Sequence, residues 1–251
     1  MDARPATAWR RYGLAGNVSS TLTCIVLSDL HIGSHGGDLE RLSGIVNEVL
    51  ARRPGLVLLG GDYVNMQVFG GGRVRPEEIA EILAPLARAA PVAAVLGNHD
   101  AEYGVRIVAE ALEAVGIPVL LNAVQRLDTD SGMIDVAGLE DHRTGQQDTA
   151  GVFARLSDPS RTLVLAHDPA SFAAVPAGPI VTVSGHTHGG QIRLPGLGAI
   201  VNASRAPLRW THGHIIEGKR HLVVSAGLGT SVLPLRLNCP PEIAELVIEP
   251  R

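Results

Sequence analysis

The chain has 251 residues, of which 45% are hydrophobic, so it is long enough to bury the core of one large α/β domain. Its formal net charge of −4 provides no basic stripe for a nucleic-acid backbone, and we expect no nucleic-acid partner. Because no apolar stretch of 18 residues is present, we expect a cytoplasmic protein, with peripheral membrane contact or a removed leader as the alternatives.

Apolar runs and helical patterns alternate along the chain, as an α/β fold requires. Residues 1–20 are expected to form an N-terminal extension, followed by one domain over 21–251. Helical spacing predicts a helix capped by Asp38, a second that starts at Pro76 and ends or kinks at Pro85, and a third over 105–115. Runs rich in Val, Ile and Leu predict buried strands at 21–28, 56–60, 91–96, 162–166 and 179–184.

The pattern after Gly116 becomes richer in short strands. We expect strands at 117–121, 124–128 and 134–139, followed by a helix at 149–156. A strand-rich second half fits two sheets packed face to face with helices outside them.

Each of the five predicted buried strands ends in a polar group that can bind a metal. Because ligands bind beyond the carboxyl ends of the strands in open α/β sheets, these side chains are expected to point into one cavity. Burying so many unpaired polar groups in an ordinary core would be costly, which favours a metal site. The groups are Asp29-Leu30-His31, Gly60-Gly61-Asp62, Gly97-Asn98-His99-Asp100, His167 and Gly185-His186-Thr187-His188.

These residue types narrow the choice of metal. Asp, His and Asn without Cys form an oxygen and nitrogen site, which suits Mn, Fe, Zn, Co or Ni. The candidates exceed what one ion needs, so we expect two divalent ions, with Mn²⁺ as the first choice; two ions about 3.5–4 Å apart can clamp an in-line displacement at phosphorus. The candidate ligands are Asp29, His31, Asp62, Asn98, His167, His186 and His188.

The ordered set Asp-x-His, Gly-Asp, Gly-Asn-His-Asp, His and Gly-His-x-His resembles the calcineurin-like metallophosphoesterase superfamily from about residue 21 onward. The segments 185–191, 226–231 and 234–243 narrow this resemblance to a bacterial branch of cell-envelope phosphodiesterases, which includes enzymes similar to UDP-2,3-diacylglucosamine pyrophosphatase. The resemblance implies an α/β fold, a four-layer α/β/β/α sandwich of two mixed sheets flanked by helices. It also implies a metal-dependent phosphoric ester hydrolase.

The resemblance also implies a role for each candidate residue. A hydroxide held between the two ions would attack phosphorus, with no covalent enzyme intermediate. His99 would protonate the leaving alkoxide or donate to the phosphoryl oxygens. The implied catalytic residues are Asp62, Asn98 and His99, with Asp29, His31 and His188 on the first ion, Asn98, His167 and His186 on the second, and Asp62 bridging both.

Two positions depart from the pattern of many relatives. Where those read Gly-Asp-x-x-Asp, this chain has Asn65, which can accept a hydrogen bond from His99 but lacks the charge that would stabilise an imidazolium. Met66 and Gln67 stand where protein phosphatases carry an Arg, which argues against a phosphoprotein phosphatase.

The expected activity is that of a phosphodiesterase or pyrophosphatase on a small or lipid-linked phosphodiester or diphosphate. A phosphomonoesterase remains the alternative, and a non-catalytic scaffold is disfavoured because every candidate ligand is present. An acyl chain would need an exposed apolar groove. Residues after Asp62 could wall such a groove or could equally pack in the core; they are Tyr63, Val64, Met66, Val68 and Phe69.

Overall fold

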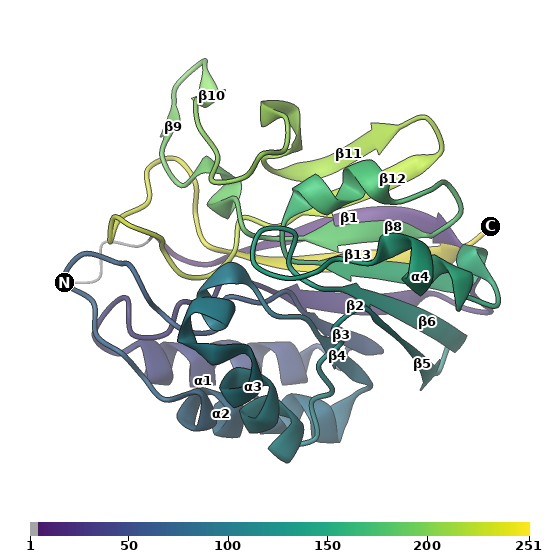
Figure 1. Ribbon diagram of the computed structural model, residues 1–251, viewed down its shortest axis with the longest axis horizontal. Coiled ribbons are helices and arrows are strands. Elements are labelled where there is room, and N and C mark those ends of the chain that lie inside the picture. The colour runs from purple at the N-terminus through teal and green to yellow at the C-terminus, as the bar shows by residue number, and fades with distance from the viewer. Residues whose placement is uncertain (1–4) are drawn as a thin grey trace.

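The structure, a computed structural model, describes residues 5–251. Two mixed β-sheets pack against each other, and helices cover their outer faces (Figure 1). The first sheet has the strand order β1 (Ala8–Gly16), β13 (Glu242–Pro250), β2 (Leu22–Leu27), β3 (Leu56–Leu59) and β4 (Val92–Ala94). The second has the order β11 (Gly213–Glu217), β12 (Arg220–Val224), β8 (Val181–Ser184), β7 (Thr162–Ala166), β6 (Gly132–Leu139) and β5 (Ala123–Thr129). The predicted four-layer α/β/β/α sandwich is confirmed.

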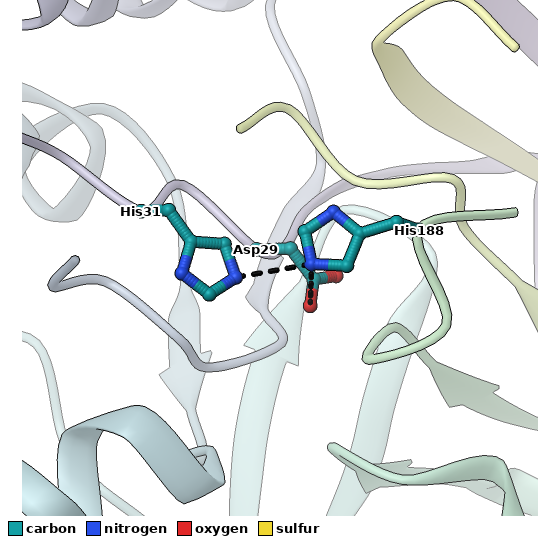
Figure 2. A group of neighbouring side chains, drawn as sticks. All are labelled: Asp29, His31 and His188. Carbon is teal, nitrogen blue, oxygen red and sulfur yellow. Dashed lines mark hydrogen bonds and ion pairs between the residues drawn. The ribbon is translucent and has the colours of Figure 1, made fainter. Parts of the chain in front are cut away.

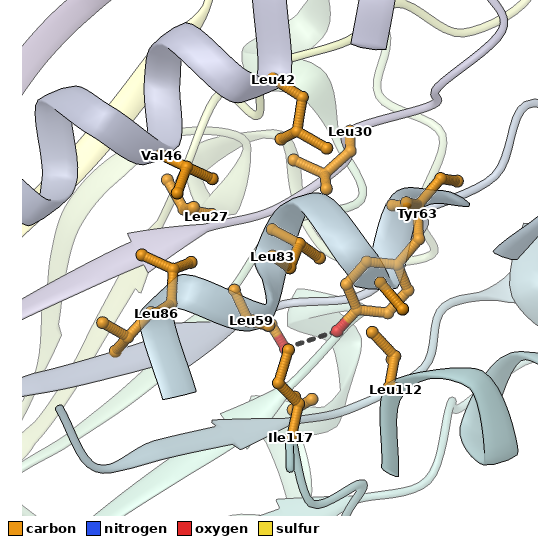
Figure 3. Packing of buried hydrophobic residues seen from close by; sticks show 14 of the residues in the cluster. Leu27, Leu30, Leu42, Val46, Leu59, Tyr63, Leu83, Leu86, Leu112 and Ile117 are labelled. Carbon is orange, nitrogen blue, oxygen red and sulfur yellow. Dashed lines mark hydrogen bonds between the residues drawn. The ribbon is translucent and has the colours of Figure 1, made fainter. Parts of the chain in front are cut away.

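Helices α1 (Asp38–Ala51), α2 (Pro76–Ala89) and α3 (Asn98–Ala114) cover the outer face of the first sheet. Leucines of these helices pack on strand residues Leu27 and Leu59 (Figure 3). The hydroxyl of buried Tyr63 donates to the carbonyl oxygen of Val95 at 3.0 Å, which satisfies its polar end inside this core.

The core between the two sheets is aliphatic. It contains Val26 and Leu58 from the first sheet and Leu165 and Val183 from the second, all fully buried. A third cluster lies under helix α4 (Thr149–Ala154) and the short 3₁₀ helices Pro169–Ala174 and Leu208–Trp210, where the rings of Phe172 and Trp210 meet at 5.1 Å. The first and second sheets are therefore fixed relative to each other by close packing.

Strand β1 was not predicted, since the first strand was expected at residue 21. Ala8–Gly16 runs parallel to β13 along its whole length and forms an edge of the first sheet. Arg10 and Arg11 on this strand are exposed, so it lacks the apolar run that identified the buried strands. These residues therefore belong to the sheet, although they lie within the predicted extension.

The structure differs from three local predictions, the first two only in part: α2 does not end at Pro85, and the predicted helix over 105–115 is the part of α3 that follows Gly104. Helix α2 continues through Pro85, because burying Leu83 and Leu86 on either side, at about 1.5–3 kcal/mol each, offsets a proline cost of about 3 kcal/mol. Helix α3 starts at Asn98 and is interrupted at Gly104, where φ is 140°. The expected strand at 117–121 is reduced to a single bridge between Ala94 and Val119.

Within residues 5–251, no helix has both the length and the apolar character needed to cross a membrane.

Leu58→Ala tests the core between the sheets. Removing this fully buried side chain should lower the free energy of unfolding by about 2–5 kcal/mol, through lost transfer energy and the cavity left behind. Ile216→Ala on β11, where the side chain is 60% exposed, is the matched control and should change it by less than about 0.5 kcal/mol. Urea unfolding measures both changes in the free energy of unfolding, provided that the variants keep the wild-type m-value. Equal unfolding midpoints for the two variants would contradict the proposed role of Leu58 in the core.

Candidate metal centre

The candidate ligands lie on turns that directly follow the strands, and the backbone of most of these turns is left-handed. Only a few per cent of residues other than glycine adopt positive φ, and each such residue costs about 1–3 kcal/mol unless the surroundings hold it in place. Five of the seven candidates do so, with φ of 53° at Asp29, 43° at His31, 55° at Asp62, 65° at His186 and 51° at His188.

Hydrogen bonds between neighbouring turns hold these conformations. The amide of Asp29 donates to the carbonyl of Gly61 at 2.9 Å, and the amide of His31 donates to the carbonyl of Asp62 at 3.0 Å. The amide of His186 donates to the Asp29 carboxylate at 2.9 Å. The turns after β2, β3 and β8 therefore fix one another.

Asp100 also holds these turns in place, although the sequence did not indicate a role for it. Its buried carboxylate accepts the amides of Asp62 at 2.7 Å, Tyr63 at 2.8 Å and Gly97 at 2.9 Å. It thereby joins the turn after β3 to the start of α3. Burial, and then the charge of Asp62, raises the pKa of Asp100 to about 7.

The first group of side chains consists of Asp29, His31 and His188 (Figure 2). His31 Nε2 and His188 Nε2 lie 3.1 Å apart, and His188 Nε2 lies 3.8 Å from Asp29 Oδ1. All three are buried, and the Ser28 hydroxyl donates to Asp29 Oδ2 at 2.7 Å. The turn after β2 supplies two members and the turn after β8 supplies the third.

The second group consists of Asp62, His167 and His186. His167 Nε2 lies 3.2 Å from Asp62 Oδ2 and 3.1 Å from His186 Nδ1. His167 Nδ1 donates to the carbonyl of Gly60 at 2.8 Å, which fixes the ring and turns Nε2 toward the other two residues. His186 and His188 thus diverge into different groups although only one residue separates them.

Asp62 lies between the two groups. Its Oδ2 is 3.5 Å from His31 Nε2 as well as 3.2 Å from His167 Nε2. Its Oδ1 accepts the amide of His99 at 2.9 Å, which fixes the carboxylate plane. One carboxylate oxygen therefore faces both groups.

The protonation states of His31, His188 and Asp62 suit cation binding. Burial alone would lower the pKa of His167, but Asp62 raises it well above its usual range, so His167 must lose its proton before it can bind a cation. Burial lowers the pKa of His31 to about 3 and holds that of His188 well below its usual range, so both imidazoles are neutral and can act as ligands. Burial alone would raise the pKa of Asp62, but His167 outweighs it and holds this pKa well below the usual range. Burial raises the pKa of Asp29 to about 6.

Asn98 adds a further donor. Its buried Oδ1 has no hydrogen-bond partner within residues 5–251, and an unpaired buried carbonyl oxygen is costly. A divalent cation would satisfy this oxygen and offset the negative charge of Asp62. The oxygen and nitrogen donors, the neutral rings of His31 and His188 and the unpaired Asn98 oxygen therefore fit a divalent cation.

The side chain beside His99 differs from the one the sequence suggested, and it makes no hydrogen bond to the ring, since His99 Nδ1 has no hydrogen-bond partner within residues 5–251. Asn65 Oδ1 accepts the amide of Val68 at 3.0 Å and its Nδ2 donates to the carbonyl of Gly72 at 3.0 Å, so this side chain holds its own loop. Glu102, one helical turn after His99, lies 3.5 Å from His99 Nδ1. The i,i+3 spacing on α3 was the signal that could have identified it.

Three other residues complete the surroundings. Arg143 Nη1 lies 3.3 Å from His186 Nε2, which places a cationic side chain at the site. Asp168 Oδ2 lies 3.6 Å from the same nitrogen, and the adjacent His167-Asp168 pair was its signal. Buried Arg236 donates to the carbonyls of Ala226 at 2.7 Å and Gly229 at 2.9 Å, and thereby holds the chain behind His188.

The chain matches the family model for calcineurin-like phosphoesterases over residues 22–190. It is 34% identical to phosphodiesterase YaeI of Escherichia coli over 230 residues, which cover 88% of this chain and 80% of that protein. It is 30% identical to the uncharacterized metallophosphoesterase YkuE of Bacillus subtilis, with 90% and 78% covered.

Solved structures share the fold. A 5'-nucleotidase precursor from Thermus thermophilus aligns with a TM-score of 0.52 at 16% identity, and the match covers 82% of this chain. This chain spans about half of that structure's length, since 49% of it is covered.

The chain therefore belongs to the calcineurin-like phosphoesterase family, and it is a metal-dependent phosphoester hydrolase.

Gly97→Ala tests the placement of the two groups. A Cβ at this position would overlap Asp62 Oδ1 and lie 2.7 Å from His167 Cε1. It would therefore displace both Asp62, which lies between the groups, and His167 of the second group. We expect Mn²⁺ binding to weaken at least about tenfold, measured by calorimetry and by metal analysis of dialysed protein. Gly44→Ala, whose Cβ would meet nothing within 4 Å, is the control, and wild-type metal affinity in Gly97→Ala would refute the geometry.

Proposed function

We propose that this protein is a dinuclear metal-dependent phosphodiesterase that cleaves a phosphodiester or diphosphate without a covalent intermediate. The observation that carries the proposal is the position of Asp62, whose Oδ2 lies within 3.5 Å of His31 Nε2 and within 3.2 Å of His167 Nε2. Asp62 would thus serve both groups if each group held one cation, whereas a single cation would leave one group of ligands unused.

The proposed ligand assignment follows the two groups. Two divalent cations, when bound, would supply a hydroxide nucleophile at neutral pH and neutralise charge on the phosphoryl oxygens. Mn²⁺ is the proposed metal, with Fe, Zn, Co and Ni as the alternatives that a donor set of oxygen and nitrogen also suits. The first ion is assigned to Asp29, His31 and His188, the second to Asn98, His167 and His186, and Asp62 to both.

Two residues of this chain would act directly on the substrate. The guanidinium of Arg143 lies at the rim beside His186 and can bind a phosphoryl oxygen through a charge-assisted hydrogen bond. His99, whose ring centroid is 4.9 Å from that of His31, would protonate the leaving oxygen. Glu102 is proposed as the positioning residue that orients the His99 ring and stabilises its protonated form.

A diester is the preferred substrate class in this proposal. A relative with 34% identity is named a phosphodiesterase, and a diester monoanion needs less cationic compensation than a monoester dianion. A phosphomonoesterase is the alternative outcome of the experiment below.

The activity is tested by comparing metal-stripped protein with protein reloaded with Mn²⁺, on bis-p-nitrophenyl phosphate and on p-nitrophenyl phosphate. We expect hydrolysis only after reloading, with kcat/KM for the diester at least about tenfold above that for the monoester. Preference for the monoester would replace the proposal by a phosphatase, and metal-independent hydrolysis would reject the centre altogether.

His99→Ala and Glu102→Gln test the proton donor and its positioning. Loss of a general acid should lower kcat by about 10²–10⁴ on an ester with a poor leaving group and far less with p-nitrophenolate. Glu102→Gln should lower kcat about fivefold with the same dependence on the leaving group, since a half-exposed ion pair contributes up to ~1 kcal/mol.

Glu110→Gln, on the same helix but in an exposed pair with Arg106, is the matched control. Restoration of kcat by Glu102→Asp would support the carboxylate role. Equal losses for good and poor leaving groups would show that neither residue takes part in proton transfer.

A further inference from the structure

An apolar pocket opens directly beside the metal centre. It encloses about 400 Å³, within the size range of small-molecule sites, and the candidate ligand His188 is part of its wall. The segments 187–203 and 231–233 form it. Its apolar lining comes from Ile192, Ile200, Val201, Val232 and Leu233.

These apolar side chains are unusually exposed for a folded protein. Ile200 is 55% exposed, Val201 68%, Val232 57% and Leu233 44%. Single exposed apolar residues are ordinary, but a contiguous group around one pocket marks a binding site. The backbone of Phe69, whose side chain is 82% exposed, is joined to this wall, since its amide donates to the Val232 carbonyl at 2.9 Å. Of the apolar residues that follow Asp62, Tyr63, Val64 and Val68 are instead buried in the core.

The pocket wall is built in a strained conformation. Val232 is β-branched and has a φ of 60°, a genuine outlier for such a side chain. The side chain of Gln191 holds this turn, donating to the carbonyls of Ser231 and Leu233 at 3.0 Å each and accepting the amide of Ser231 at 2.8 Å. Strain retained in this way is typical of functional positions.

Three of the polar side chains that line the pocket are already paired within the protein. Gln191 is occupied as described, Thr187 donates to the carbonyl of Thr211 at 2.7 Å, and Asn202 donates to Thr211 Oγ1 at 3.0 Å. Among the described residues that line the pocket there is no Asp, Glu, Lys or Arg. A sugar or nucleobase would therefore lose its hydrogen bonds to water on entering, whereas a hydrocarbon chain would gain from burial.

We propose that this pocket binds an aliphatic chain attached to the phosphoryl group that the metal centre cleaves. Because the pocket and the centre share His188, a chain esterified to the phosphorus can enter the pocket while the phosphoryl group stays between the metal ligands. This inference rests on the proposed phosphodiesterase function and names its substrate class, a phosphodiester that carries an aliphatic chain.

A homologous series of p-nitrophenyl alkyl phosphates tests the proposal, with methyl, propyl, butyl and hexyl esters below their micelle concentrations. The reacting bond and leaving group stay the same, so only the chain changes. With Mn²⁺-loaded protein, kcat/KM should rise with chain length, by up to about fourfold for each methylene that becomes buried.

A double variant locates the effect. Val201→Ser with Val232→Ser should flatten the chain-length series, so that the ratio of kcat/KM for the hexyl ester to that for the methyl ester falls toward one. Ile216→Ser is the control, because Ile216 is 60% exposed but lies on β11 outside the pocket lining, and it should keep the wild-type slope.

The outcomes separate this inference from the proposed function. Metal-dependent cleavage with a flat series in wild type would overturn the chain pocket and leave the phosphodiesterase standing, and so would a slope that survives the double variant. If no ester is cleaved, the phosphodiesterase proposal fails, and calorimetry with methyl and hexyl phosphonate on Mn²⁺-loaded protein decides the pocket. The chain pocket would be supported if hexyl phosphonate binds more tightly than methyl phosphonate and the double variant removes this difference. Equal affinities for the two compounds in the wild type would overturn it.

Discussion

The left-handed turns after the strands are the constraint on which the rest of the site depends. Sheets that pack face to face lie about 10 Å apart, so side chains rising straight from the strand ends of both sheets would remain separated. The turns fold the chain inward, and nitrogen atoms from the two sheets approach to 3.1 Å at His31 and His188. Each proposed ion therefore takes ligands from both sheets, and the aliphatic core between the sheets sets the spacing of those ligands.

Such turns persist only because neighbouring groups stabilise them. Asp100 accepts three amides, and the Asp29 carboxylate accepts the amide of His186, so one turn cannot relax without breaking bonds to the next. The glycines beside the ligands serve the same end. A Cβ on Gly185 would overlap both Ser28 and Asp29, and so a side chain there would displace a candidate ligand. The site is thus organised by its protein surroundings as well as by the charge of the cations proposed for it.

Much of the candidate site could be predicted from the sequence. Polar residues directly after buried apolar runs are costly to bury unless they bind a ligand or a metal ion. The grouping of the candidate residues in one cavity followed from that pattern, whereas the four-layer sandwich was implied by the family resemblance, in agreement with the strand-rich second half. Strand β1 was not predicted, because its exposed Arg10 and Arg11 carry no apolar signal. The sequence also did not predict that Glu102, and not Asn65, lies beside His99. This depends on the direction of the Asn65 side chain, which makes its hydrogen bonds within its own loop.

The segment from His186 to Gln191 connects the centre with the proposed chain pocket. It supplies two candidate ligands, then Gly189 and Gly190 in left-handed conformations, and then the glutamine that holds the turn at Val232. Buried Arg236 binds carbonyls behind His188, so this segment is fixed from its inner side as well. Because the same short stretch positions both candidate ligands and the pocket wall, a chain seated in the pocket would be held at a fixed distance from the proposed cations. The binding energy of the chain would then orient the phosphoryl group for attack. Contacts remote from the reacting atoms raise the rate of a chemical step when they are used in this way.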